Sequence, residues 1–126
     1  MHIAKTIDAS AEILWRILID TERWPQWGPS VVQVDYRQRW IEAGAIGRIK
    51  TVLGFWLPFE VTVFRPREYW HWNVAGVSAT GHRITTLSAN KSQLSFEFPS
   101  LAFPYGVVCK KALKNIDLLA KQELNP

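Results

Sequence analysis

Apolar residues recur at helical spacing in two parts of the chain. Residues 11–19 carry apolar side chains three or four positions apart, and Ser10 can cap the N-terminus of a helix there. A longer series lies near the C-terminus, where lysines occupy the opposite side. We therefore predict a short helix over residues 11–19 and a long amphipathic helix that begins between Ser100 and Tyr105 and ends near Glu123. Its apolar positions are Tyr105, Cys109, Ala112, Ile116 and Leu119.

Between Val31 and Phe98 the apolar and polar residues alternate with a period of two, which is typical of strands with one covered face. Turn residues such as Gly54 and Gly76 divide this region into segments. We predict five or six antiparallel strands here, preceded by a short strand at residues 2–8. The apolar positions of three of them are Phe59, Val61 and Val63, then Trp70, Trp72 and Val74, then Leu94, Phe96 and Phe98.

The order of these elements predicts an α+β fold. A strand and a short helix come first, a meander of strands follows, and one long helix ends the chain. The apolar face of the sheet must be covered, and the C-terminal helix is the one long apolar helix available. We expect a curved antiparallel sheet wrapped around that helix. Because no linker or low-complexity tract interrupts residues 1–126, we expect a single domain.

The composition excludes several classes of protein. The chain has 126 residues and one cysteine, Cys109, so no intramolecular disulfide can form. We expect a cytoplasmic location, since the sequence contains neither the apolar stretch of a signal peptide nor one long enough to span a membrane. The histidines are His2, His71 and His82, and none stands at a spacing typical of metal ligands. We therefore expect no metal site and no cofactor.

The charge is modestly basic. Fifteen Lys and Arg against eleven Asp and Glu give a formal net charge of +4. That excess is small and its arginines are scattered, so DNA binding is not expected. Four lysines line one side of the C-terminal helix, which is typical of a solvated face. A weak contact of this side with an anionic surface or a protein partner is the alternative. These lysines are Lys110, Lys111, Lys114 and Lys121.

Four motifs follow one another along the chain. They are Trp15 with the corner from Asp20 to Trp27, the turn from Gly44 to Gly47, the segment from Pro66 to Trp72, and Gly81-His82-Arg83. In this order and spacing the sequence resembles the START-like (SRPBCC) superfamily. That superfamily includes pollen-allergen-type proteins, polyketide cyclases and aromatases, and coenzyme Q-binding proteins. The resemblance covers nearly the whole chain and implies a helix-grip fold with a ligand cavity between sheet and C-terminal helix. Because the chain is shorter than many members, we expect the lids that enlarge this cavity to be trimmed.

The alternation of the strands indicates which side chains face the implied cavity. Residues two apart on a strand share a face, so Trp70 and Trp72 belong together. The next strand can present either His82 or Arg83 to the interior. We predict His82, from the resemblance and because a neutral imidazole costs less to bury than a guanidinium. The candidate ligand-binding residues are Trp70, Trp72, His82, Ile84, Phe96, Phe98, Tyr105, Cys109 and Ala112.

Other residues have simpler expected roles. Trp15 and Trp24 should be buried parts of the framework, because they lie in the first helix and the corner. Cys109 should be an inert buried thiol. Trp56 lies in a Gly- and Pro-containing segment and is expected at an exposed hairpin tip, where it is a candidate for a cavity mouth, a partner contact or a membrane contact.

These features support three functions. The first is a small intracellular protein that binds an apolar or aromatic molecule, such as a lipid, a quinone or a polyketide-like compound. The second is a polyketide cyclase or aromatase that uses the same cavity, and the third is a protein- or ribosome-interaction module. No motif identifies a catalytic residue, so the sequence leaves open whether a reaction occurs. The acid–base candidates on the central strands are His82, His71, Tyr69, Arg83 and Glu60.

Overall fold

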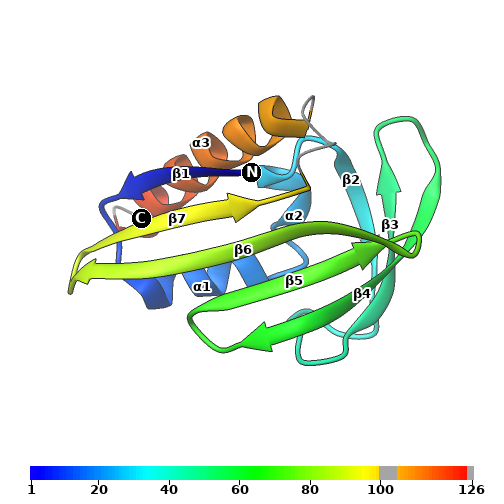
Figure 1. Cartoon of the computed structure of the whole chain (residues 1–126), viewed down its shortest axis with the longest axis horizontal. Helices are drawn as coiled ribbons and strands as arrows, with labels where there is room; N and C mark the ends of the chain where they lie inside the picture. The colour runs from blue at the N-terminus through cyan, green and yellow to red at the C-terminus, as the bar shows by residue number, and fades with distance from the viewer. Residues whose placement is uncertain (100–104, 125–126) are drawn as a thin grey trace.

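The computed structural model describes residues 1–99 and 105–124. The strands are β1 (His2–Ile7), β2 (Val31–Asp35), β3 (Ile46–Thr51), β4 (Trp56–Arg65), β5 (Tyr69–Val74), β6 (Val77–Ser88) and β7 (Lys91–Glu97). The helices are α1 (Ala11–Ile19), α2 (Trp24–Trp27) and α3 (Tyr105–Leu124). Within this described part, seven strands form one antiparallel sheet in the order β1-β7-β6-β5-β4-β3-β2. The sheet curves, and α3 crosses behind the β1, β7 and β6 side (Figure 1).

This arrangement confirms the predicted helix-grip fold of the α+β class. The region between Val31 and Phe98 contains six strands, the larger of the two expected numbers. The C-terminal helix begins at Tyr105 and ends at Leu124, as the apolar spacing predicts. The start of the predicted range, Ser100, lies outside the described residues. None of the described helices is long and apolar enough to cross a membrane.

The first helix forms where its sequence signals predict it. The Ser10 side chain accepts a hydrogen bond from the Ile13 N–H (3.3 Å), which satisfies one of the free donors at the start of α1. Trp15 and Leu18 are buried, as expected from their positions on the apolar side. On α3 the predicted polar positions, including Lys111 and Lys114, are exposed.

The core lies between the concave face of the sheet and α3. His82 and Ile84 on β6 point into it, while Arg83 between them forms an ion pair with Glu97 outside (2.7 Å). The prediction that His82, and not Arg83, faces the interior is therefore confirmed. The buried residues of the two flanking strands and of α3 include Trp70, Trp72, Leu94, Phe96, Cys109, Ala112 and Ile116.

The short helix α2 turns the chain sharply and places two indole rings in the core. The Trp24 Nε1–H donates to the carbonyl of Leu18 (2.9 Å), and the Trp27 Nε1–H donates to that of Ile17 (3.3 Å). Carbonyls at the end of a helix lack partners within it, so these bonds satisfy two acceptors of α1. The Trp24 ring also stacks on Trp70, with centroids 5.5 Å apart and planes within 6°.

A buried carboxylate holds the other side of this corner. Asp20 ends α1 and is only 1% exposed. It accepts hydrogen bonds from Arg39 Nε (3.0 Å) and Nη2 (2.8 Å) and from the Glu22 N–H (3.0 Å). A β-bridge between Asp20 and Trp40 adds a backbone connection. The loop between β2 and β3 is thereby attached to the end of α1.

The Trp24 indole should contribute more to stability than any exposed indole. Replacing Trp24 with Phe removes buried apolar volume and the donor to Leu18, so we expect a loss of about 2–3 kcal/mol in the free energy of unfolding. Trp56→Phe is the matched control and should cost less than about 1 kcal/mol, since this side chain is partly exposed. Urea unfolding followed by circular dichroism measures both. Equal losses in the two variants would contradict this account of the corner.

Candidate functional site

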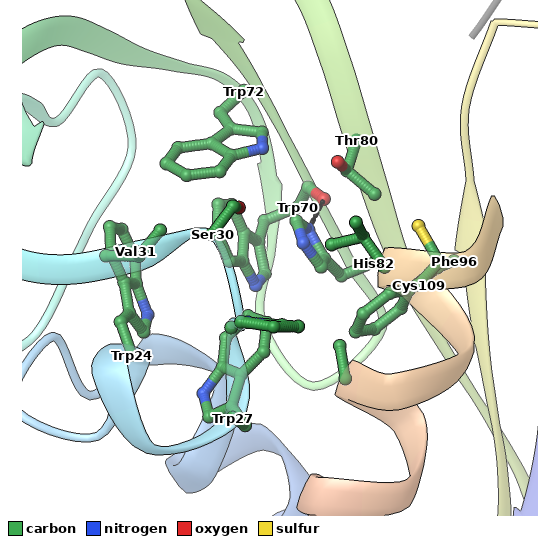
Figure 2. Close-up of a pocket in the computed structure, with 14 residues that line it drawn as sticks. Trp24, Trp27, Ser30, Val31, Trp70, Trp72, Thr80, His82, Phe96 and Cys109 are labelled. Atoms are coloured by element: carbon green, nitrogen blue, oxygen red, sulfur yellow. Dashed lines mark hydrogen bonds between the residues drawn. The ribbon is translucent and has the colours of Figure 1, made fainter. Parts of the chain in front are cut away.

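A small cavity lies between the central strands and α3. Its volume is about 30 Å³. The rings of Trp70, Trp72 and His82 come from the sheet, and Cys109 comes from α3, as Figure 2 shows. We call this space the inner cavity. Its lining residues are Trp24, Trp27, Gly28, Pro29, Ser30, Val31, Trp70, Trp72, Thr80, His82, Phe96, Val108, Cys109 and Ala112.

A larger open groove adjoins the inner cavity. Its volume is about 260 Å³, and Ser30, Val31 and Trp72 line both spaces. We call it the outer groove. Most of its walls are apolar side chains from β2 to β6. Its lining residues are Ser30, Val31, Ile49, Thr51, Leu57, Trp72, Val74, Ser78, Ala79 and Pro99.

The structure brings most of the predicted site residues together. Those that line the inner cavity are Trp70, Trp72, His82, Phe96, Cys109 and Ala112. Ile84 and Phe98, also predicted for the site, are buried in the core but line neither the inner cavity nor the outer groove. Both face the core, as their parity predicts. Ile84 lies beyond His82 on β6, whereas Phe98 lies between Phe96, which lines the inner cavity, and Pro99, which lines the outer groove. The side chain of Tyr105, also predicted for the site, lies outside the described residues.

Sequence reasoning missed the contribution of the α2 corner and the segment after it. Trp24 was expected to serve the framework; it does so and also lines the inner cavity, as do Trp27, Ser30 and Val31. The α2 segment contacts α3, and Asn115 Nδ2 donates a hydrogen bond to the Trp27 carbonyl (3.2 Å). The Trp-Pro pattern signals a corner, but no local signal tells which face of the sheet the corner covers.

Two indole donors in this site lack acceptors. Among the described residues, Nε1 of Trp70 and Nε1 of Trp72 are buried and have no hydrogen-bond partner. Leaving a buried donor unpaired costs about 1–3 kcal/mol. The N–H groups of Trp24 and Trp27, by contrast, are bonded to carbonyls of α1. These two indoles therefore belong to the framework, whereas those of Trp70 and Trp72 keep a donor for a ligand. The Tyr36 hydroxyl is also unpaired, but it lines neither hollow.

His82 is a neutral part of the aromatic wall. Its ring stacks on Trp70 with centroids 3.9 Å apart, and its Nδ1 lies 3.2 Å from the Trp70 carbonyl. A carbonyl only accepts, so Nδ1 carries the proton and Nε2 carries the lone pair. Burial lowers the pKa of His82 from 6.5 to about 3. The ring is therefore uncharged at neutral pH.

The whole site is free of formal charge. None of the residues that line the inner cavity or the outer groove is acidic, lysine or arginine. Burial raises the pKa of the Cys109 thiol to about 11, so this group is protonated at neutral pH. Within residues 1–99 and 105–124, no cluster of His, Cys, Asp and Glu is arranged to hold a metal ion. The geometry suits an uncharged molecule that offers an acceptor to indole N–H groups.

The other central histidine lies on the opposite face of the sheet. His71 Nδ1 is 2.8 Å from Thr62 Oγ1, and His71 Nε2 is 3.0 Å from Ser78 Oγ. In the register of β5 and β6, His71 pairs with Gly81 and Trp70 pairs with His82. The two histidines are therefore not opposite each other and cannot act on one ligand.

Comparison with known proteins agrees with this architecture. The family described as "Polyketide cyclase / dehydrase and lipid transport" matches residues 1–113. None of the curated proteins matches the chain in sequence.

Solved structures with the same fold cover almost the whole chain. The Zhui aromatase/cyclase from Streptomyces sp. R1128 has a TM-score of 0.75 at 14% identity, over 99% of this chain and 94% of that one. The protein XoxI from Bacillus cereus has a TM-score of 0.76 at 13% identity, over 100% and 98%. A START superfamily protein from Mycobacterium smegmatis has a TM-score of 0.70 at 18% identity, over 97% of each chain. At these identities the likeness concerns the fold.

The buried imidazole should make the fold sensitive to acid. Below pH 6.5 the unfolded chain binds a proton at His82 that the folded chain does not bind until about pH 3. Stability should therefore fall as the pH drops through this window, by about 3 kcal/mol at pH 4.5. Urea unfolding between pH 7 and pH 4.5 measures this slope.

The variant His82→Gln replaces the ring N–H with an amide donor and removes the titrating group. The dependence of its unfolding free energy on pH should therefore be clearly flatter. His71→Gln is the control on the outer face and should keep most of the wild-type slope. An unchanged slope in His82→Gln would contradict a buried neutral imidazole.

Proposed function

The chain belongs to the polyketide cyclase / dehydrase and lipid transport family, and from that premise we propose that it binds an uncharged, mainly apolar or aromatic small molecule. The body of the ligand lies in the outer groove, and one of its oxygen atoms accepts hydrogen bonds at the inner cavity. The observation that carries the proposal is the pair of buried indole donors on Trp70 and Trp72, unpaired among the described residues.

The outer groove has the character of a small-molecule site. Ligand sites typically enclose about 300–1,000 Å³ and have apolar walls with few polar groups. The groove, at about 260 Å³, is just below that range. Its walls include Val31, Leu57 and Val74, which offer apolar contact. A two-ring aromatic molecule or a short lipid chain fits this description, whereas a sterol is too large.

The inner cavity adds polar selectivity. At about 30 Å³ it holds a single oxygen-sized group rather than a ring. A carbonyl, phenol or quinone oxygen placed there lies beside the rings of Trp70 and Trp72, which carry the unpaired N–H groups. In the free protein, water can occupy this place, and a ligand oxygen would replace it. Because the walls carry no charge, an anionic ligand would lose its hydration without compensation.

The cyclase alternative uses the same site for a reaction. The fold shared with the Zhui aromatase/cyclase supports it, and the cavity could orient a reactive chain. Among the described lining residues, however, the only imidazole is that of His82, whose pKa of about 3 makes it a weak base at neutral pH. We therefore place binding first. The third alternative, an interaction module, predicts a filled core, and the inner cavity and outer groove therefore favour it less than binding. The expected contact through the lysine side of α3 stays a prediction.

A pair of probes that differ in one oxygen tests the proposal. We expect 2-acetylnaphthalene to bind several-fold more tightly than 2-ethylnaphthalene, because only the first carries an acceptor and a neutral hydrogen bond contributes about 1 kcal/mol. Trp72→Phe removes one donor and should reduce this preference. Isothermal titration calorimetry measures both dissociation constants for each protein.

Trp27→Phe is the matched control, since the N–H of Trp27 is already bonded to Ile17. It should keep the preference for the acetyl compound, whatever happens to the absolute affinity. Ala79→Phe narrows the outer groove and should weaken both probes. Equal affinities of the two probes for the wild-type protein, or a preference unaffected by Trp72→Phe, would sink the proposal.

A further inference from the structure

The hairpin between β3 and β4 presents apolar side chains directly to solvent. We call residues 52–56 the hairpin tip. Leu53 is 79% exposed and Phe55 is 65% exposed, and Val52 and Trp56 are exposed as well. Apolar side chains grouped on one exposed turn contribute no packing to the core. Such a group indicates a contact surface.

The backbone of the tip is fixed, so these side chains are held outward. The Thr51 N–H bonds to the Phe55 carbonyl (2.9 Å), and the Gly54 N–H bonds to the Thr51 carbonyl (2.9 Å). Gly54 has a φ of +90°, a conformation that side chains disfavour. The Val52 N–H also bonds to the Ser30 carbonyl (3.2 Å), which ties the tip to a residue that lines both hollows.

Basic side chains flank the indole of the tip. Lys50 is the cross-strand partner of Trp56, and the Arg48 guanidinium lies over the Trp56 ring at 5.0 Å from its centroid. Arg48 is also paired with Asp35 (2.6 Å). An indole beside cationic side chains is suited to the boundary between water and lipid, where the ring is half buried and the charges meet phosphates.

The end of the molecule around the tip carries a small positive charge. The segments that line the outer groove beside the tip include residues 30–31, 49–57 and 72–79. Together they contain Lys50 and no aspartate or glutamate, and the Asp35 carboxylate close to the tip is paired with Arg48. This end therefore complements an anionic surface.

We propose that the hairpin tip inserts into the interfacial layer of an anionic lipid bilayer. Thr51 and Leu57, the residues on either side of the tip, line the outer groove, so insertion brings the groove mouth to the membrane. A bilayer fits better than a folded partner, because a single turn is far smaller than the roughly 800 Å² per side of a standard protein interface. The proposal goes beyond ligand binding and does not depend on it.

Vesicle cosedimentation of the full chain, with no ligand added, tests the proposal. We expect binding to vesicles of three parts phosphatidylcholine to one part phosphatidylglycerol and much weaker binding to phosphatidylcholine alone. Leu53→Asp and Phe55→Asp should each weaken binding by about tenfold or more, because they place a charge in the apolar layer. Lys50→Gln should weaken it by about fivefold at low salt.

Leu87→Asp is the matched control. Leu87 is also an exposed leucine, 53% accessible. The strand β6 begins at Val77, next to Ser78 in the outer groove, and Leu87 lies near its other end, about 33 Å farther along the strand. This variant should bind vesicles like the wild-type protein. Bromine-labelled lipids should quench the tryptophan emission of the wild-type protein, and Trp56→Phe should lose most of that quenching.

Several outcomes would overturn the proposal. These are no binding to anionic vesicles, equal weakening by Leu87→Asp and Leu53→Asp, or a concentration-dependent dimer in solution that Leu53→Asp abolishes, which would assign the tip to a second copy of the chain. Ala79→Phe separates this proposal from ligand binding. It should weaken binding of 2-acetylnaphthalene while vesicle binding persists, so failure of either proposal is recognised without reference to the other.

Discussion

Two indole rings from the α2 corner determine how much space is left between the sheet and α3. Trp24 and Trp27 reach into the core because their N–H groups are bonded to the last carbonyls of α1. From there Trp24 stacks on Trp70, and Trp27 packs edge-on against His82, with ring centroids 6.0 Å apart. The remaining inner cavity measures only about 30 Å³. A ligand larger than a single oxygen-sized group must therefore lie mainly in the outer groove.

The same packing explains the chemistry of the site. Dense aromatic surroundings exclude water, which keeps His82 and Cys109 uncharged at neutral pH. They also leave Trp70 and Trp72 with buried donors that no described residue satisfies. A neutral apolar wall with two free donors discriminates by the presence of an acceptor, not by charge. Such a wall supports the proposed ligand binding, and the cyclase alternative would need the same orientation of ligand.

Sequence reasoning predicted what depends on local pattern. Period-two alternation placed Trp70 and Trp72 on the inner face, and the relative cost of burying imidazole and guanidinium placed His82 there in preference to Arg83. The pattern does not show how far along each strand the hollow extends, and Ile84 and Phe98 are buried beside it without lining it. It also could not show that the corner, through Trp27, would fill most of the cavity, since that depends on packing between segments far apart in sequence.

The most direct test of this account is the indole region of a ¹H–¹⁵N NMR spectrum during titration with 2-acetylnaphthalene. The chain has seven tryptophans, so each indole N–H can be assigned by single substitution. The account predicts that the resonances of Trp70 and Trp72 move downfield as they gain an acceptor, while those of Trp24 and Trp27 keep their positions within the hydrogen bonds to α1. Saturable binding that leaves the Trp70 and Trp72 resonances unmoved, or that shifts Trp24 and Trp27 instead, would contradict it.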